Sequence, residues 1–142
     1  MKIVFDTNIV LDVLLIREPY AQMSMNLFDA VVSKEIEGYL CATTITTIDY
    51  LVAKIQDKQK SRELIRRLLD VFSVAEVNEA VLKKAVDSDF SDFEDAVLYQ
   101  AGCYVGVDGF VTRNAKDFKT ADLPIYSPDE LWQLIQQGIK HD

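Results

Sequence analysis

Apolar and polar residues follow two patterns along the chain, one typical of strands and one typical of helices. Short runs of β-branched and aromatic residues predict strands at residues 2–5, 38–42, 71–74, 109–112 and 125–126. Apolar residues at helical spacing predict helices near residues 8–15, 21–32, 46–56, 61–69, 78–86, 92–104 and 127–137. Strands that alternate with helices form a parallel sheet with right-handed crossovers. We therefore expect a three-layer α/β/α fold whose central, mostly parallel sheet has about five strands.

The start of the last predicted helix is the most clearly marked boundary in the chain. Ser127 can cap the helix, Pro128 suits its first position, and Glu130 can close a capping box. Gly138 is then placed to end the same helix.

The composition fits one compact domain over residues 1–142. With 49% hydrophobic residues the chain can bury a sizeable core, and no shift in composition marks a linker. No apolar run reaches membrane-spanning length, and the charge at Asp6 comes too early for a signal peptide. We expect a cytoplasmic protein with no membrane partner. Cys41 and Cys103 lie in apolar surroundings without metal-ligand spacing, which favours reduced core thiols.

The formal net charge of −8 argues against binding of a polyanion by the surface as a whole. A local exception is a basic stripe formed by Lys58, Arg62 and Arg66, which recur every four residues and would align along one helix face. This stripe can track RNA phosphates. The interpretation we favour is a solvent-facing helix surface whose charge Asp57 and Glu63 balance.

Carboxylates follow the predicted strands and begin a late helix. Asp6 comes directly after the first strand, and Asp92 and Asp95 stand three residues apart in one predicted first turn. Asp6 and the secondary acid Asp92 can each be explained as a helix cap, but capping does not account for Asp95. Acids crowded at one sheet edge repel each other unless a cation neutralises them. Their oxygen ligands suit Mg²⁺ or Mn²⁺.

Several catalytic classes are disfavoured by single residues. The only histidine is His141, close to the end of the chain, which argues against a Ser-His-Asp hydrolase or a histidine-based ribonuclease. Asn8 stands where a phosphatase of the two-aspartate type needs an acid.

Three segments, in this order, resemble the PIN-domain nucleases. They are Asp6-Thr7-Asn8, Asp92-Phe93-Glu94-Asp95, and Thr112-Arg113-Asn114 followed by Asp117-Phe118. Each segment alone is a weak signal, whereas their order and spacing over nearly the whole chain are specific. In size the chain is similar to the small VapC-type toxin ribonucleases of bacterial toxin–antitoxin pairs.

The resemblance implies a Mg²⁺- or Mn²⁺-dependent endoribonuclease that hydrolyses RNA phosphodiester bonds. Asp6 and Asp95 would hold the metal, while Asn114 and Asp117 would orient a ligand or a second ion. Contacts to RNA are expected from Thr7, Asn8 and Arg113, and from the basic stripe if it tracks phosphates. The resemblance also implies an RNA substrate, a cognate antitoxin protein and a homodimer.

The sequence departs from the PIN pattern after the second strand, where the family has an acid. By hydrophobic spacing that position falls on Thr47, whereas the nearest acid, Asp49, lies two residues further on. Two residues turn a helix by more than half a circle, so only one of them can face the site. We expect Asp49 to be the functional acid, because three carboxylates hold a divalent ion better than two. The alternatives are that Asp49 is an ordinary exposed residue, and that the chain is a non-catalytic PIN-like scaffold for RNA or protein.

Overall fold

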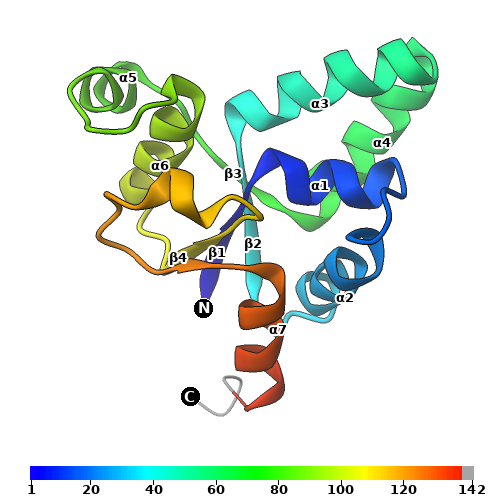
Figure 1. Ribbon diagram of the computed structural model, residues 1–142. Coiled ribbons are helices and arrows are strands. Elements are labelled where there is room, and N and C mark those ends of the chain that lie inside the picture. Colours follow the sequence, from blue (N-terminus) through cyan, green and yellow to red (C-terminus); the bar gives the residue numbers. More distant parts are fainter. Residues whose placement is uncertain (139–142) are drawn as a thin grey trace.

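The structure is a computed structural model that describes residues 1–138. Five short strands form one sheet at the centre of the molecule (Figure 1). The strands are β1 (Lys2–Phe5), β2 (Glu37–Cys41), β3 (Ser73–Ala75), β4 (Gly109–Val111) and β5 (Ile125–Tyr126). Their order across the sheet is β3-β2-β1-β4-β5, and each neighbouring pair is parallel. The predicted α/β class and central parallel sheet are therefore confirmed. His141 lies outside the described residues.

Helices cover both faces of the sheet. They are α1 (Thr7–Leu14), α2 (Ala21–Val32), α3 (Ala42–Ile55), α4 (Lys58–Val71), α5 (Glu79–Val86), α6 (Phe93–Val105) and α7 (Pro128–Gln136), together with the short 3₁₀ helix η1 (Ala115–Phe118). Figure 1 shows α5 and α6 on one side of the sheet and α1, α2 and α7 on the other, with α3 and α4 packed as a pair. This is the expected three-layer arrangement.

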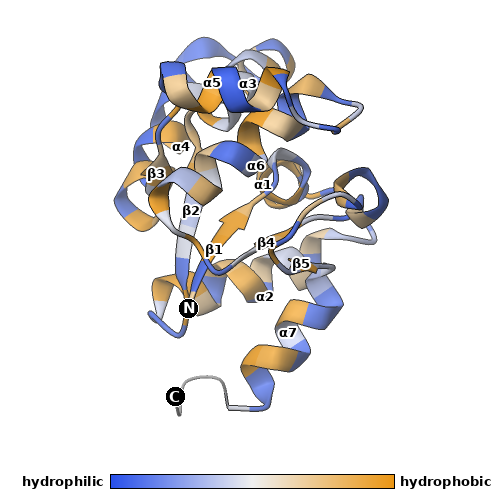
Figure 2. Ribbon diagram, turned by 90° about the vertical axis from the view of Figure 1, so that its left-hand side faces the viewer, coloured by the Kyte–Doolittle hydropathy of each residue, from blue (hydrophilic) through white to orange (hydrophobic). Residues whose placement is uncertain are grey.

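Strand β1 shows how the sequence produces these layers. Its residues Ile3, Val4 and Phe5 are all fully buried. Because successive strand side chains point to opposite faces, Ile3 and Phe5 enter the core beneath α1, α2 and α7, while Val4 enters the core beneath α6. Figure 2 shows this hydrophobic strand in the middle of the molecule. Asp6, the next residue, is consequently placed at the centre of the carboxyl edge of the sheet.

Most helix boundaries agree with the sequence pattern. The capping box of Ser127 and Glu130 is present at the start of α7, and Gly138 has a positive φ of 89° just beyond its end. Asn78 and Asp92 cap α5 and α6, as their side-chain chemistry predicts.

Two predicted helix starts and one strand are wrong in detail. Helix α3 begins at Ala42, not near residue 46, because the chain turns directly out of β2 without a capping side chain. Helix α4 begins at Lys58, because Asp57 caps it by accepting a 2.7 Å hydrogen bond from the Lys60 N–H. The helix also continues to Val71, so that β3 starts two residues later than predicted.

Neither cysteine is bonded to the other. Cys41 is buried, Cys103 is half-buried, and both are free thiols, as predicted. None of the helices in residues 1–138 combines the length and the apolar character that crossing a membrane requires.

Candidate active site

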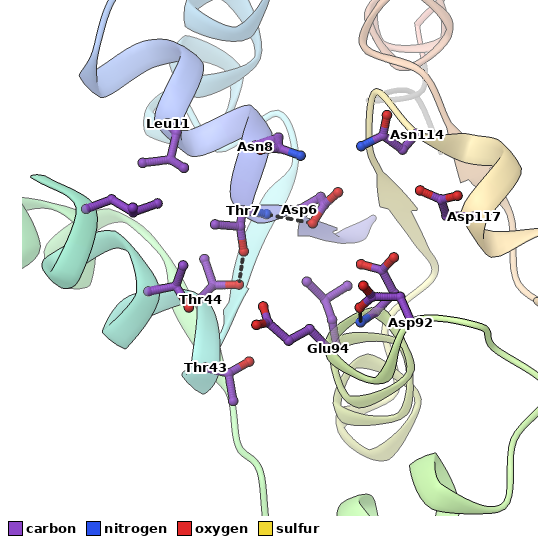
Figure 3. Close-up of a pocket in the computed structure, with 14 residues that line it drawn as sticks. Asp6, Thr7, Asn8, Leu11, Thr43, Thr44, Asp92, Glu94, Asn114 and Asp117 are labelled. Atoms are coloured by element: carbon purple, nitrogen blue, oxygen red, sulfur yellow. Dashed lines mark hydrogen bonds between the residues drawn. The ribbon is translucent and has the colours of Figure 1, made fainter.

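Asp6 is the most tightly held acid at the carboxyl edge of the sheet. Its Oδ1 accepts a 2.8 Å hydrogen bond from the Thr7 N–H and so caps α1, while its Oδ2 accepts a 2.7 Å bond from the Thr112 hydroxyl. The residue is only 7% exposed. Both carboxylate oxygens therefore have a fixed direction, and Asp6 lies at an opening bordered by the starts of α1 and α6 and by the loop that carries Asn114 and Asp117 (Figure 3).

That opening is a pocket of about 340 Å³. Its walls come from the starts of α1, α3 and α6 and from the loop after β4. The lining residues are Asp6, Thr7, Asn8, Leu11, Thr43, Thr44, Thr47, Leu51, Asp92, Glu94, Asp95, Leu98, Asn114 and Asp117. The structure thus brings together seven of the residues predicted from the motifs: Asp6, Thr7, Asn8, Asp92, Asp95, Asn114 and Asp117.

The first turn of α6 supplies acids to the pocket wall that faces Asp6. Asp92 Oδ1 accepts a 3.0 Å hydrogen bond from the Asp95 N–H, so Asp92 is a helix cap that also lines the pocket. Asp95 is only half-buried. It is the third residue of the helix and lines the same pocket, where the negative charges of Asp6 and Asp117 act on it.

The loop after β4 is tied directly to Asp6. The Thr112 hydroxyl donates to Asp6 and accepts a 3.0 Å hydrogen bond from the Asn114 N–H. This one buried hydroxyl fixes Asn114 relative to Asp6. Figure 3 shows the side chains of Asn8 and Asn114 pointing toward each other, with Asp117 beside Asn114.

The acids of this pocket raise each other's proton affinity. Burial is the main cause that raises the pKa of Asp95 to about 7, followed by the negative charges of Asp6, Asp92, Asp117 and Glu94. Burial also raises the pKa of Asp6, although the hydrogen bonds from Thr112 and Thr7 partly oppose the rise. The pocket therefore concentrates negative charge that a bound cation would relieve.

Comparison with known proteins identifies the family of this chain. A family model described as "PIN domain" matches residues 2–116. The chain belongs to the PIN-domain family. Ribonuclease VapC1 of Aquifex aeolicus (strain VF5) is 23% identical over 138 residues, which cover 91% of this chain and 92% of the relative.

Solved structures of other proteins share the fold at low sequence identity. The VapBC2 structure from Rickettsia felis, bound to a DNA fragment from its promoter, matches with a TM-score of 0.69 and 12% identity, covering 89% of this chain and 98% of that chain. A toxin–antitoxin complex from Klebsiella pneumoniae matches with a TM-score of 0.67 and 19% identity, covering 88% and 96%.

The donor set suits a hard divalent cation. All the polar side chains that converge here carry carboxylate, amide or hydroxyl oxygens, which Mg²⁺ and Mn²⁺ prefer. Within residues 1–138, no three Asp, Glu, His or Cys side chains are grouped as a ready-made set of metal ligands. Mutual repulsion of carboxylates opposes such a grouping when no cation is bound.

The expectation that Asp49 supplies the second PIN acid is wrong. Its carboxylate faces α4, where Oδ1 accepts a 2.8 Å hydrogen bond from the Ser61 hydroxyl and lies 3.5 Å from Arg62 Nε. Thr47 lines the pocket instead. The two-residue step from Thr47 turns Asp49 by more than half a circle, onto the opposite side of α3.

Threonines consequently form the wall where the PIN pattern has an acid. Thr43, Thr44 and Thr47 all line the pocket on α3. Thr44 is buried, and its hydroxyl shares a 2.9 Å hydrogen bond with the hydroxyl of Thr7, which ties α3 to α1. This wall is polar and neutral.

The basic stripe does not reach the pocket. Lys58, Arg62 and Arg66 are exposed on α4, and none of them lines the cavity. Arg62 lies beside Asp49, as above. The geometry agrees with the solvent-facing interpretation and gives no support for a phosphate track leading into this pocket.

Arg113 also differs from its expected place at the substrate. Its guanidinium donates to both carboxylate oxygens of Asp12, with Nε 2.7 Å from Oδ2 and Nη2 3.2 Å from Oδ1. The same group lies 3.8 Å from the centre of the Tyr20 ring. Arg113 thus holds the loop after β4 against α1 and the start of α2, and its positive charge partly opposes the rise in the pKa of Asp6.

Sequence reasoning missed Asp12, which is fully buried and also pairs with Arg17 at 3.0 Å. The signal was an acid on the apolar side of an otherwise hydrophobic helix, because such a charge must find a partner. It also missed Glu94 as a pocket residue, although its first-turn position beside Asp95 was visible in the sequence.

Proposed function

We propose that this PIN-domain protein is a Mg²⁺- or Mn²⁺-dependent endoribonuclease. The observation that carries the proposal is the convergence of Asp6, Asp95, Asn114 and Asp117, from three separate segments, in one pocket at the carboxyl edge of the sheet. Ligands bind at this edge in open α/β sheets. The curated relative named a ribonuclease spans nearly the whole chain, which supports the same activity.

Within this proposal the side chains have separate roles. Asp6 and Asp95 would hold the metal, and Asp117 would take a second coordination position or a metal-bound water. When bound, the ion would lower the pKa of a coordinated water and offset charge on the phosphate. Asn8 and Asn114, whose side chains face each other, would donate hydrogen bonds to phosphate oxygens. Thr7 would act by holding α3 against α1 through Thr44.

We further propose that the protein is the toxin of a toxin–antitoxin pair. Its structural neighbours include a chain from a toxin–antitoxin complex of Klebsiella pneumoniae and the sarcin–ricin loop-cleaving toxin VapC20 of Mycobacterium tuberculosis. An antitoxin that covers the pocket would need to offer positive charge, because the pocket presents an excess of carboxylates. Co-expression with the product of the adjacent reading frame would test for a stable complex with an antitoxin. The expected homodimer stays a prediction, which sedimentation analysis would test.

One observation favours a second function, a PIN-like scaffold that binds RNA or protein without cleaving it. The α3 wall of the pocket has threonines where the PIN pattern has an acid, so one negative ligand is absent from that wall. A site with fewer carboxylates binds a divalent ion more weakly.

An RNA cleavage assay separates the two functions. The purified protein is incubated with single-stranded RNA in Mn²⁺, in Mg²⁺ and in EDTA. The nuclease proposal predicts cleavage with either metal, none in EDTA, and loss of cleavage in Asp6→Asn and Asp95→Asn. Asp29→Asn, an exposed acid on α2 away from the pocket, is the matched control and should cleave like the wild type. Intact RNA under all conditions would favour the scaffold.

A further inference from the structure

The neutral wall of α3 faces an acid on α6. Figure 3 shows the Glu94 carboxylate extending from the start of α6 toward Thr43 and Thr44. Glu94 lines the same pocket as Asp6 and Asp95. The Glu94 carboxylate, which comes from α6, thus extends toward the α3 wall of the pocket, where no acid is present.

Glu94 lies at the pocket and is free to act as a metal ligand. It is the second residue of α6 and is exposed, and within residues 1–138 it takes part in no side-chain hydrogen bond or ion pair. Its three side-chain torsions let the carboxylate swing toward Asp6 or away from it. Its charge already acts on Asp95, whose proton affinity it helps to raise.

The neighbouring acid is less suited to this role. Asp92 uses Oδ1 to cap the helix through the Asp95 N–H at 3.0 Å, and moving it would leave that N–H without its cap. A glutamate at the second helical position can be explained by its favourable interaction with the helix dipole alone. That explanation, however, does not account for its place in the pocket opposite the threonine wall.

We propose that Glu94 takes the place of the missing α3 acid and is the third carboxylate on the divalent ion, with Asp6 and Asp95. This inference rests on the proposed metal-dependent function. Hard cations bind more tightly as the number of charged ligands rises, so a third carboxylate compensates for Thr47. The carboxylate is supplied from α6 across the pocket, and α3 contributes only hydroxyl groups.

Calorimetric titration of the full chain with Mn²⁺ tests the assignment. Glu94→Gln should weaken Mn²⁺ binding by about 10-fold or more, the range that loss of even an outer ligand partner produces. Glu79→Gln is the matched control, because Glu79 is also an exposed glutamate in the first turn of a helix, α5. It should bind Mn²⁺ like the wild type.

A carboxylate transfer makes the test specific. Adding Thr47→Glu to the Glu94→Gln variant moves the acid from α6 to α3, and Mn²⁺ affinity should return to near the wild-type value. Electron paramagnetic resonance of bound Mn²⁺ should report one ion in both proteins.

The outcomes separate this inference from the proposed function. Unchanged Mn²⁺ affinity in Glu94→Gln, together with lost binding in Asp6→Asn, would overturn the role of Glu94 and leave the metal site intact. If Glu94→Gln weakens Mn²⁺ binding and the added Thr47→Glu does not restore it, Glu94 does not take the place of the missing α3 acid. Absence of Mn²⁺ binding by the wild type would overturn both proposals.

Discussion

The Thr112 hydroxyl donates a 2.7 Å hydrogen bond to Asp6 Oδ2 across 106 positions of sequence. The bond joins the end of β1 to the end of β4, which are neighbours in the sheet. Both residues are buried, so the contact is protected from water. The first and last motifs of the chain therefore meet as one structural unit.

Replacing Thr112 by Val should damage both stability and metal binding. The variant keeps the shape of the side chain but leaves Asp6 Oδ2 and the Asn114 N–H without their partner, which costs about 1–3 kcal/mol of unfolding free energy. Urea unfolding measures the loss, and Thr112→Ser should recover most of it. Thr46→Val, an exposed threonine on α3, serves as the control. Wild-type stability and Mn²⁺ affinity in Thr112→Val would contradict the role assigned to this hydroxyl.

Arg113→Ala should be strongly destabilising. The substitution leaves the fully buried Asp12 with only Arg17 as its charged partner, and breaking a buried ion pair costs about 3 kcal/mol or more. Arg67→Ala removes an exposed pair with Glu63, 3.8 Å apart, and should cost less than about 1 kcal/mol. Chemical denaturation of both variants gives the comparison. Equal losses would show that the Asp12 contact carries no special weight.

Metal binding should strengthen as the pH rises through neutrality. The pKa of Asp95 is about 7, because burial and then Asp6, Asp92, Asp117 and Glu94 disfavour its ionised form. The metal requires the ionised carboxylate, so Mn²⁺ affinity should rise between about pH 6 and pH 8. Asp95→Asn should bind more weakly and show a shallower pH profile.

The metal-free protein should respond to pH in the opposite direction. The folded chain keeps a proton on Asp95 up to about pH 7, whereas the unfolded chain releases it near the ordinary pKa of 3.8. The unfolded state then binds fewer protons, so the unfolding free energy falls as the pH rises through this window. Thermal unfolding in EDTA at several pH values tests this. Between pH 5 and pH 7, the melting temperature in EDTA should change less favourably in the wild type than in Asp95→Asn. A larger rise of the melting temperature in the wild type than in Asp95→Asn would contradict the raised pKa of Asp95.

The two candidate acids of α3 should behave differently. Thr47→Glu places a carboxylate in the pocket and should tighten Mn²⁺ binding, whereas Asp49→Ala should leave it unchanged. Asp49→Ala should instead lower stability modestly, since the Ser61 hydroxyl loses its acceptor. Calorimetry and urea unfolding of the two variants separate these effects. Loss of Mn²⁺ binding in Asp49→Ala would reverse the assignment.

Much of the fold was predictable because strong local signals coincide with tertiary structure. The hydrophobic residues of β1 and the capping box at Ser127 specify their elements without help from the rest of the chain. The start of α3 was not predictable, because Ala42, Thr43 and Thr44 suit a strand end as well as a helix start. The expectation for Asp49 was wrong for a different reason, because it rested on the gain from a third carboxylate, whereas the hydrophobic spacing of the helix correctly points Thr47 toward the pocket.

The motif residues of the pocket were predictable, but the buried ion pair beside it was not. Asp6, Asp95 and Asn114 follow recognisable motifs at the ends of strands and the start of a helix. Arg113 and Asp12 meet only through the packing of the β4 loop on α1, a contact over 101 positions that no local pattern reveals.

The central claim is that Asp6 and Asp95, from different segments of the chain, bind one divalent ion together. Titration calorimetry of Mn²⁺ into wild type and Asp6→Asn tests it most directly, with circular dichroism to show that the variant is folded. The account predicts one ion bound per wild-type chain and no measurable binding by Asp6→Asn, with Asp95→Asn also severely impaired. Binding of Mn²⁺ by folded Asp6→Asn with wild-type affinity would contradict it.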